Sequence, residues 1–404
     1  MRQGILFVDD DQNVLLGLQR MLRFMRDEWE MRFVDSGERA LAALDREHFD
    51  AVVSDMRMPG MDGAELLAEV SRRYPGIVRV ILSGYSEEEA VMRTVGPAHQ
   101  FLAKPCPPQT LVEVIRRALE LRRVLDPDLL RKLLAGIESL PSPSAAYFAL
   151  VEYMDDPHAS ATGVADIIGR DVAMTAELLK LTNSAYFTAP SRVATPLQAV
   201  RILGFETLRA LVLRIGIFRS FRGLPAMGRL MEELNRDSFL VARIARRIAR
   251  SEGFDVRRME EAFCAGMLSS IGLLVLLEHL PKPCGKARDA VEGGVSLLEA
   301  ESHAFGATHV QVGAYLLGLW GFNKAVVEAV AFSGRPGAAP VSSMDVAGVV
   351  HVARVLAGPS PAYQIPGAPA ETGLLPLDRD YLRSIGRMEC WDEWRADADA
   401  ERQS

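Results

Sequence analysis

Cysteine is scarce in this chain of 404 residues. The cysteines form no CxxC pair and no even framework, so they do not predict a fold held together by disulfides. Sparse thiols are typical of a reducing compartment, where we expect them to be buried or inert. They are Cys106, Cys264, Cys284 and Cys390.

Long hydrophobic runs are also missing. The most apolar stretch, residues 263–280, is interrupted by Ser269, Ser270 and Glu278 and is short for a membrane span, which favours a buried helix. The chain begins MRQGILFVDDD, and three aspartates within its first eleven residues leave no room for a signal peptide. We therefore expect a cytoplasmic protein with no membrane partner.

An excess of positive charge is absent as well. The net charge is -7 and the pI is near 5.7, which argues against a surface dominated by nucleic-acid contacts, although a small basic patch is compatible with that average. About half of the residues are hydrophobic and a quarter are charged, as in soluble globular proteins. The length indicates two domains and a tail.

The first 122 residues contain short apolar runs that alternate with segments of helical periodicity. Four of these runs end abruptly in polar or charged residues, and residues 31–34 supply a fifth strand. Such alternation predicts an α/β domain, with a doubly wound, five-stranded parallel sheet covered by helices on both faces. The four runs are residues 5–8, 51–54, 78–82 and 100–103.

Chemically related side chains follow these strands. The carboxyl ends of parallel strands share one edge of the sheet, so we expect Asp9, Asp10, Asp55, Ser83 and Lys104 to converge. Clustered carboxylates attract a cation, and an all-oxygen site suits Mg²⁺. An aspartate can attack a phosphoryl group, while the metal and the lysine ammonium neutralise the transferred oxygens. The serine offers a short hydroxyl that can swing toward the phosphorylated aspartate.

The motifs VDDD at 8–11, SDMRMPGMDG at 54–63, LSGY at 82–85 and KPC at 104–106 resemble the receiver domain of response regulators. The resemblance covers residues 1–122. It implies Asp55 as phosphoacceptor and Asp10 with Asp55 as direct Mg²⁺ ligands. It also implies that Asp9 assists and that the backbone carbonyl of Arg57 completes the coordination. We interpret Asp11 as the N-cap of the first helix.

The same resemblance implies a set of switch residues. Ser83 would be the switch hydroxyl, and Lys104 would supply the ammonium. Pro105 would be the site of a cis peptide bond that aims the lysine. Phe101 would be the aromatic side chain that changes rotamer, although packing in the core explains an aromatic residue at a strand end equally well.

Residues 123–136 form a helical linker that continues the pattern of the last receiver helix. A dimerising coiled coil, and hence a homodimer, and a simple amphipathic connector both fit this pattern. Beyond it, strand patterns nearly vanish and helical periodicity continues to about residue 331, which predicts an all-α domain of about ten helices.

Several sequence segments of this second part resemble the HDOD domain. This domain is a relative of HD-type metal phosphohydrolases that generally lacks the metal ligands of those enzymes. We assign residues 137–340 to this output domain. The phrases are IESLPSPSAAYFALVEYMDDP at 137–157, IIGRDVAMTAELLKLTNSAYF at 167–187, AVRILGFETLRALVL at 199–213, EEAFCAGMLSSIGLLVL at 260–276 and HVQVGAYLLGLWGFNKAVVEAV at 309–330.

The positions that hold the metal in HD hydrolases are substituted here. Ser269 and Ser270 stand where the His-Asp pair is expected, Asp237 stands at the first His, and Arg354 stands at the later Asp. Two hydroxyls do not hold a divalent ion, and an arginine would repel one. We therefore expect a non-catalytic domain. Residues 341–404 are expected to form one helix and a partly disordered acidic tail, whose Trp391 and Trp394 suggest a docking contact.

Together these features predict a two-component response regulator. A histidine kinase would phosphorylate Asp55, and the helical domain would then expose or hide a surface for a downstream signalling protein. By family analogy, the pathway involves cyclic-di-nucleotide signalling, motility or biofilm control. The alternatives are an HD-type phosphodiesterase, a phosphate sink, and a DNA-binding regulator that uses the basic stretch RIARRIAR at 243–250. A solvated helix face explains that stretch more simply.

Overall fold

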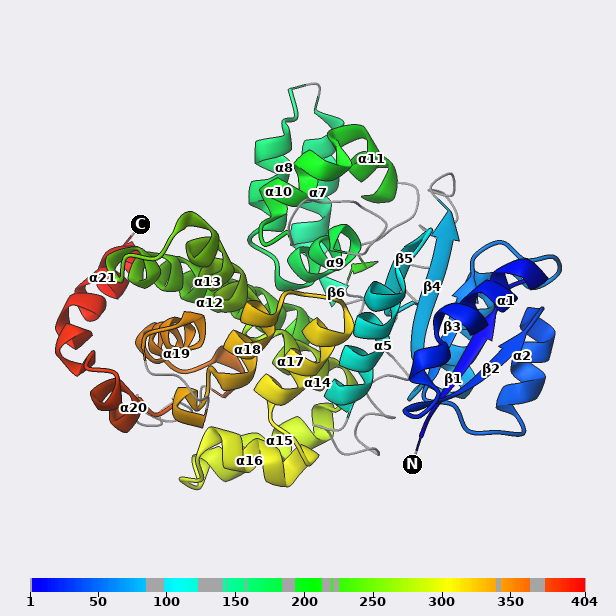
Figure 1. Cartoon of the computed structure of the whole chain (residues 1–404). Helices are drawn as coiled ribbons and strands as arrows, with labels where there is room; N and C mark the ends of the chain where they lie inside the picture. Colours follow the sequence, from blue (N-terminus) through cyan, green and yellow to red (C-terminus); the bar gives the residue numbers. More distant parts are fainter. Residues whose placement is uncertain are drawn as a thin grey trace.

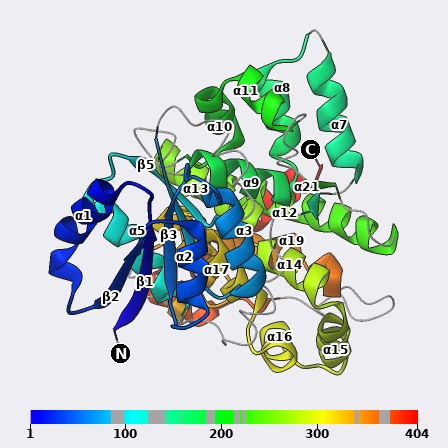
Figure 2. The ribbon, with the colours of Figure 1, turned by 90° about the vertical axis from the view of Figure 1, so that its right-hand side faces the viewer.

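The computed structural model describes residues 2–84, 98–122, 141–142, 144–156, 158–183, 193–212, 219–220, 225–338, 343–363 and 375–403. An N-terminal sheet domain lies beside a larger helical domain, and the two are in contact through the helix that closes the sheet domain (Figure 1). Figure 2 looks onto the sheet domain, with the helical domain behind it. The expected linker at 123–136 lies outside the described residues.

The N-terminal domain has a five-stranded parallel sheet in the order β2-β1-β3-β4-β5, which confirms the doubly wound α/β fold. Its strands are β1 (Gln3–Val8), β2 (Trp29–Val34), β3 (Ala51–Asp55), β4 (Val78–Gly84) and β5 (Gln100–Lys104). Its helices are α1 (Gln12–Met21), the 3₁₀ turn η1 (Arg23–Met25), α2 (Gly37–Leu44), α3 (Gly63–Arg73) and α5 (Pro108–Arg122).

The strands are apolar on both sides because both faces of the sheet are covered. Ile5 and Phe7 of β1 belong to an apolar cluster that includes residues of α1 and α5. Leu6 and Val8, which point to the opposite face, pack in a second cluster with residues of α2 and α3. The first cluster continues into the helical domain, so the two domains share apolar packing.

Local interactions fix the loops at the carboxyl edge of this sheet. The Asp11 carboxylate accepts a hydrogen bond from the Asn13 N–H at 2.8 Å, which confirms Asp11 as the N-cap of α1. Asp62 and Glu65 form a capping box at the start of α3. A Cβ atom on Gly63 would lie 2.1 Å from the backbone oxygen of Asp55. Only glycine therefore allows α3 to begin so close to the end of β3.

The second domain is helical, as expected, apart from one parallel pair of two-residue strands, β6 (Pro141–Ser142) and β7 (Arg219–Ser220). Its described residues form more helices than the expected ten or so. They are α7 (Ser144–Asp155), α8 (Ala161–Ile168), α9 (Val172–Thr182), α10 (Pro196–Leu203), α11 (Phe205–Ala210), α12 (Pro225–Ser251), α13 (Val256–Leu268), α14 (Ile271–His279), α15 (Pro281–Glu292), α16 (Leu297–Phe305), α17 (His309–Leu319), α18 (Lys324–Phe332) and α19 (Val346–Ala357).

The most apolar stretch is divided between two helices. The expected single helix at 263–280 is in fact the end of α13 and all of α14, separated at Ser269 and Ser270. By length and composition Val256–His279 could cross a membrane, but 89% of its most apolar window is buried inside the protein. Gly272 brings α14 against α17, because a Cβ atom there would lie 2.0 Å from the His309 backbone oxygen.

The C-terminal region differs from the expected tail. The expected helix is present as α19, and it packs against α12, α13 and α18 of the helical domain. The acidic end is an ordered helix, α21 (Trp391–Gln403), rather than a disordered tail. Trp394 is fully buried, which confirms the predicted docking contact. The remaining elements are α20 (Arg379–Ser384) and the 3₁₀ turns η3 (Pro336–Ala338), η4 (Pro361–Tyr363) and η5 (Met388–Cys390).

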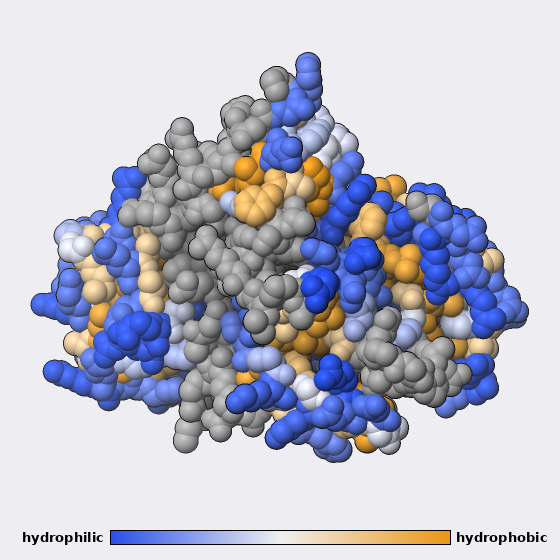
Figure 3. Space-filling view, turned by 180° about the vertical axis from the view of Figure 1, so that it is seen from behind, coloured by the Kyte–Doolittle hydropathy of each residue, from blue (hydrophilic) through white to orange (hydrophobic). Residues whose placement is uncertain are grey.

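The basic stretch at 243–250 lies on α12, and α21 packs against it. Arg243 pairs with Glu401 at 2.6 Å, and Arg247 pairs with Asp397 at 2.6 Å. Part of the predicted solvated face of α12 is therefore covered by an acidic helix of the same chain. Elsewhere, hydrophilic side chains cover much of both outer ends of the molecule (Figure 3).

Candidate functional site

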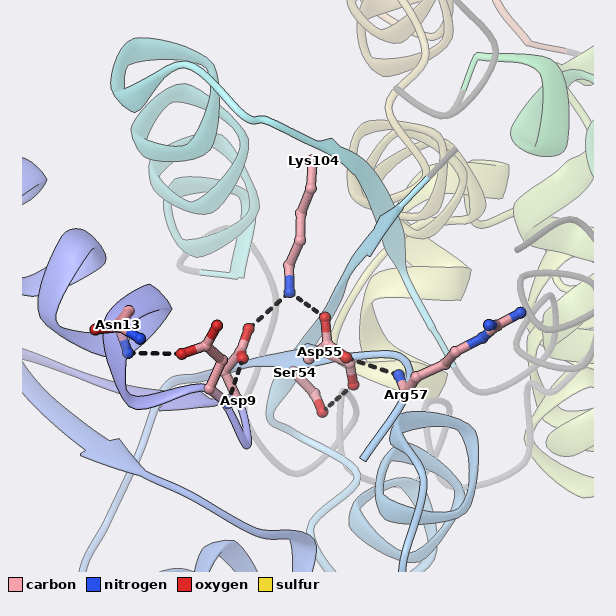
Figure 4. Close-up of polar contacts among 7 residues, drawn as sticks. Asp9, Asn13, Ser54, Asp55, Arg57 and Lys104 are labelled. Atoms are coloured by element: carbon pink, nitrogen blue, oxygen red, sulfur yellow. Dashed lines mark hydrogen bonds and ion pairs between the residues drawn. The ribbon is translucent and has the colours of Figure 1, made fainter. Parts of the chain in front are cut away.

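Two aspartates and one lysine form a site at the carboxyl edge of the sheet, which we call the acidic site. Asp9 follows β1, Asp55 ends β3, and Lys104 ends β5 (Figure 4). Asp10 follows Asp9 in the chain. Asp9 and Asp55 are buried, whereas Asp10 is exposed. The Lys104 Nζ donates to Asp9 Oδ2 at 2.6 Å and also to Asp55 Oδ1. Of the five residues predicted to converge, Asp9, Asp55 and Lys104 are in contact. Asp10 is placed next to Asp9 by the chain alone, so its part in the site stays a prediction.

The backbone holds the carboxylates in place. Asp55 Oδ2 accepts a hydrogen bond from the Arg57 N–H at 2.7 Å, and Asp9 Oδ1 accepts one from the Asp11 N–H at 3.0 Å. The predicted cis peptide bond between Lys104 and Pro105 is present. Each buried carboxylate thus has one oxygen on a backbone N–H and the other on the ammonium (Figure 4).

Burial and charge shift the pKa values at this site. Burial raises the pKa of Asp55; Lys104 partly offsets the rise, and the nearby Asp9 carboxylate adds to it. Burial alone would lower the pKa of Lys104, but its hydrogen bonds to Asp55 and Asp9 raise the pKa overall. The ammonium therefore stays protonated while it neutralises two buried acids.

The donor set fits Mg²⁺. Among the described residues, no three acidic, histidine or cysteine side chains converge closely enough to form a complete cage. Mg²⁺ does not need one, since it keeps several waters and is commonly held by one or two carboxylates. Asp55 and Asp9 would supply oxygen ligands, and the exposed Asp10 follows Asp9 in the chain. The predicted ligand carbonyl of Arg57 follows Asp55 by two residues.

Two predicted switch residues are placed only by their strands. Ser83 lies in β4 opposite Ala103 of β5, and Phe101 lies opposite Ile81. The side chains of Ser83 and Phe101 lie outside the described residues, so their switch roles stay predictions.

The four substituted HD positions are in the helical core. Asp237 of α12 and Arg354 of α19 form an ion pair, with side chains 9% and 6% exposed. Ser269 and Ser270 are buried between α13 and α14, and the Ser269 hydroxyl donates to the Gly266 carbonyl at 2.8 Å. The Arg354 cation therefore neutralises the Asp237 carboxylate, so two of the four substituted positions pair with each other. Sequence reasoning identified both residues but not their pairing, although their opposite charges were a clue.

The contact between the two domains contains polar residues that sequence reasoning missed. We call it the domain junction. From the sheet domain it includes Arg79 at the start of β4 and His99 and Gln100 at the start of β5, all three buried. The His99 Nε2 lies 2.7 Å from the Arg79 Nη2. Burial lowers the pKa of His99 well below its usual range, and the nearby cations Arg79 and Lys180 of α9 lower it further.

Hydrogen bonds across the junction reach the end of α17. The Gln100 Nε2 donates to the Leu319 carbonyl, and the Arg117 guanidinium of α5 donates to the Phe322 carbonyl at 2.7 Å. Helix α5 packs directly against α17 (Figure 1). A second apolar stripe on α5, Val112 and Leu119, is buried in addition to its sheet-facing residues. That stripe was the sequence clue to a second packing partner.

A doubly wound sheet with buried carboxylates and a lysine at its carboxyl edge defines the receiver class of domain. In agreement, residues 5–116 match the response regulator receiver domain, and residues 140–336 match the HDOD domain. The chain belongs to the response regulators, with a receiver domain followed by an HDOD domain.

Curated relatives match over a limited length. The hydrogenase transcriptional regulatory protein HoxA of Cupriavidus necator is 36% identical over 118 residues, 29% of this chain and 24% of the relative. The transcriptional regulatory protein GlrR of Escherichia coli is 38% identical over 117 residues, 29% of this chain and 26% of the relative. The chain thus spans about a quarter of the length of these relatives.

Solved structures are similar over one or both domains. The MmoQ response regulator of Methylococcus capsulatus covers 64% of this chain and 98% of its own, with 20% identity and a TM-score of 0.45. The signal receiver domain of an HD-domain-containing protein from Pseudomonas fluorescens covers 30% of this chain and 98% of its own, with 30% identity and a TM-score of 0.29.

Proposed function

We propose that a histidine kinase phosphorylates Asp55 and that this reaction controls a non-catalytic protein-interaction domain. An Asp55 carboxylate oxygen attacks the phosphorus of a phosphohistidine, forming a P–O bond while the P–N bond breaks and the imidazole leaves. Lys104 neutralises charge on the transferred oxygens. Mg²⁺, which receiver domains generally use, would be held by Asp10, Asp55 and the Arg57 carbonyl with help from Asp9, and would supply further neutralisation.

The observation that carries this proposal is the position of β5. Its carboxyl end supplies Lys104 to the acidic site, and its amino end supplies Gln100 to the domain junction. A phosphoryl group on Asp55 would displace the Lys104 ammonium from the carboxylate oxygen that it now contacts, and we propose that the end of β5 readjusts with it. Ser83 and Phe101, on the same two strands, would take part. The strand is short and continuous, so its movement would reach the Gln100–Leu319 contact.

The HD-type phosphodiesterase is the less favoured alternative. The Asp237–Arg354 pair fills ligand positions with a bound cation of the protein itself, and a buried guanidinium disfavours a second cation nearby. We therefore propose that the HDOD domain acts by binding and not by hydrolysis. A phosphate sink, in which Asp55 takes phosphoryl groups without an output, is disfavoured by the buried and hydrogen-bonded junction.

The DNA-binding alternative depends on the arginines of α12. Arg243, Arg246 and Arg247 are paired with Glu401, Glu260 and Asp397, so their charge is largely neutralised within the chain. We therefore propose a downstream signalling protein as partner, rather than nucleic acid, and a cytoplasmic location. Cyclic-di-nucleotide signalling, motility or biofilm control is the proposed pathway.

A pull-down tests the switch. Wild type with and without beryllofluoride, a phosphoryl mimic, is compared with Asp55→Ala under the same conditions. We expect a partner whose capture changes with beryllofluoride in wild type but not in Asp55→Ala. Identical partner sets in all states would refute the proposed switch.

A further inference from the structure

The carboxyl end of α17 is incomplete without the receiver domain. Helix α17 ends in a turn with Gly321 at φ +78. Within this turn the Phe322 N–H bonds to the Leu317 carbonyl at 3.0 Å and the Gly321 N–H to the Gly318 carbonyl at 3.2 Å, the Schellman arrangement. These bonds satisfy the carbonyls up to Gly318. The next one, on Leu319, is satisfied by Gln100 of the receiver domain.

A second receiver side chain completes this end. Arg117 donates to the Phe322 carbonyl just beyond the helix, and its positive charge lies where the helix dipole is negative. The Gln100 amide of β5 and the Arg117 guanidinium of α5 therefore act together as a cap for the carbonyls of Leu319 and Phe322. The receiver domain, and not the helical domain, provides this cap.

The side chains around this cap are buried. Lys180 of α9 is buried over the Trp320 ring, with its Nζ 5.1 Å from the ring centroid, and pairs with the buried Glu177 at 3.6 Å. Buried carbonyls that lose their donors carry a large desolvation cost. If the receiver withdraws, this surface is left with the acceptors Leu319 O and Phe322 O beside an aromatic ring, and it requires new donors.

We propose that this surface, the carboxyl end of α17 with Trp320 and Lys180, is where the HDOD domain binds its partner. The partner's chemistry follows from the present occupants: an amphipathic helix with an arginine next to an apolar stripe, as in α5 with Arg117 and Val112, and an amide donor such as Gln100 of β5. The receiver and the partner then compete for one surface, and this inference deepens the proposed function by naming the surface that the switch controls.

A peptide probe tests the assignment in the full-length protein. A fluorescent peptide with the sequence of residues 107–122 is titrated with the chain, and binding is followed by anisotropy. We expect beryllofluoride, or the double substitution Gln100→Ala/Arg117→Ala, to tighten binding at least about tenfold relative to the untreated chain, because either change frees the surface. A peptide with Arg117→Ala should bind about tenfold more weakly, since a charge-assisted bond is lost.

The outcomes separate the two proposals. If the double variant binds the peptide and beryllofluoride has no effect, the surface assignment holds and the phosphorylation switch fails. If the double variant, with the helical circular dichroism of wild type, does not bind, the surface assignment is wrong. Equal binding of both peptides would overturn the proposed donor chemistry. Arg117→Glu, which repels the Phe322 carbonyl, serves as the second opening variant if the first does not fold.

Discussion

The acidic site and the Asp237–Arg354 pair both set a basic side chain against carboxylates, but their surroundings differ. At the acidic site Lys104 is 28% exposed, and the neighbouring Asp10 faces solvent. In the helical domain Arg354 is only 6% exposed and its partner 9%. The first arrangement is partly open to solvent, whereas the second is enclosed by the protein.

The choice of base follows the same division. A lysine ammonium is a point charge on a flexible stem, and it can move aside when a phosphoryl group arrives. An arginine guanidinium is planar and always charged, which suits a permanent buried pair. A cation beside carboxylates therefore suits chemistry where the site is partly exposed to solvent. The same arrangement suits a structural role where it is buried.

The largest expected effect is at the acidic site. Asp55→Asn should abolish phosphorylation by acetyl phosphate in the presence of Mg²⁺, because the amide cannot form an acyl phosphate. Phosphate-affinity gel electrophoresis measures the product. Asp11→Asn is the matched control and should be phosphorylated normally, because it changes only the capping side chain of α1 and keeps the backbone N–H that donates to Asp9. Full phosphorylation of Asp55→Asn would place the phosphoacceptor elsewhere.

The buried Asp237–Arg354 pair should contribute to the stability of the helical domain. Arg354→Ala leaves the buried Asp237 carboxylate without its cation and should lower the free energy of unfolding of the helical domain by about 3 to 5 kcal/mol. Urea unfolding followed by circular dichroism gives this value. The exposed Arg335→Ala is the control, with a change near zero. The double variant Asp237→Ala/Arg354→Ala should be more stable than Arg354→Ala alone; an equal or larger loss would argue against the pair.

Acid should loosen the domain junction. His99 is buried beside Arg79 and Lys180, with Glu177 and Tyr315 nearby, and its lowered pKa keeps it neutral in the closed junction. An opened junction lets His99 titrate at its ordinary pKa. The open form therefore gains protons first as the pH falls below about 6.5, and closure loses up to about 1.4 kcal/mol per pH unit.

Hydrogen exchange of α17 at pH 7.5 and pH 5.5 measures this effect, after correction for the intrinsic pH dependence of exchange. His99→Gln, which does not titrate, should show a much smaller difference between the two pH values. A pH response of equal size in wild type and His99→Gln would mean that another group controls the junction.

The smallest expected effect is at the surface. Asp397→Ala breaks the pair with Arg247, whose side chain is 44% exposed, so solvent screens most of its energy. We expect only a small loss in the free energy of unfolding, which diminishes further at high salt. Chemical denaturation at low and high ionic strength checks this. A loss as large as that of Arg354→Ala would show that Asp397 contributes more than surface pairing.

The receiver half could be predicted from sequence because its constraints are local. Short apolar strands, each followed by a polar residue, determine both the sheet and its reactive edge. The N-cap at Asp11 likewise depends on adjacent residues, whereas the cis bond before Pro105 was implied by the resemblance to receiver domains. These features need no knowledge of distant contacts.

The rest depends on residues far apart in sequence. Asp397 and Glu401 are four residues apart, as are Arg243 and Arg247, and this matching spacing marks two helix faces that pair. Read alone, the acidic end suggested disorder. The junction residues Arg79 and Gln100 stand out only as polar residues in apolar strands, and the structure was needed to show their partners.

Hydrogen exchange in the presence of Mg²⁺ and beryllofluoride tests the central claim, that the state of Asp55 controls the contact between β5 and α17. We predict that beryllofluoride increases exchange of residues 100–104 and 316–322 by about tenfold in wild type and leaves Asp55→Asn unchanged. Unchanged exchange in wild type with beryllofluoride bound, or the same increase in Asp55→Asn, would contradict the account.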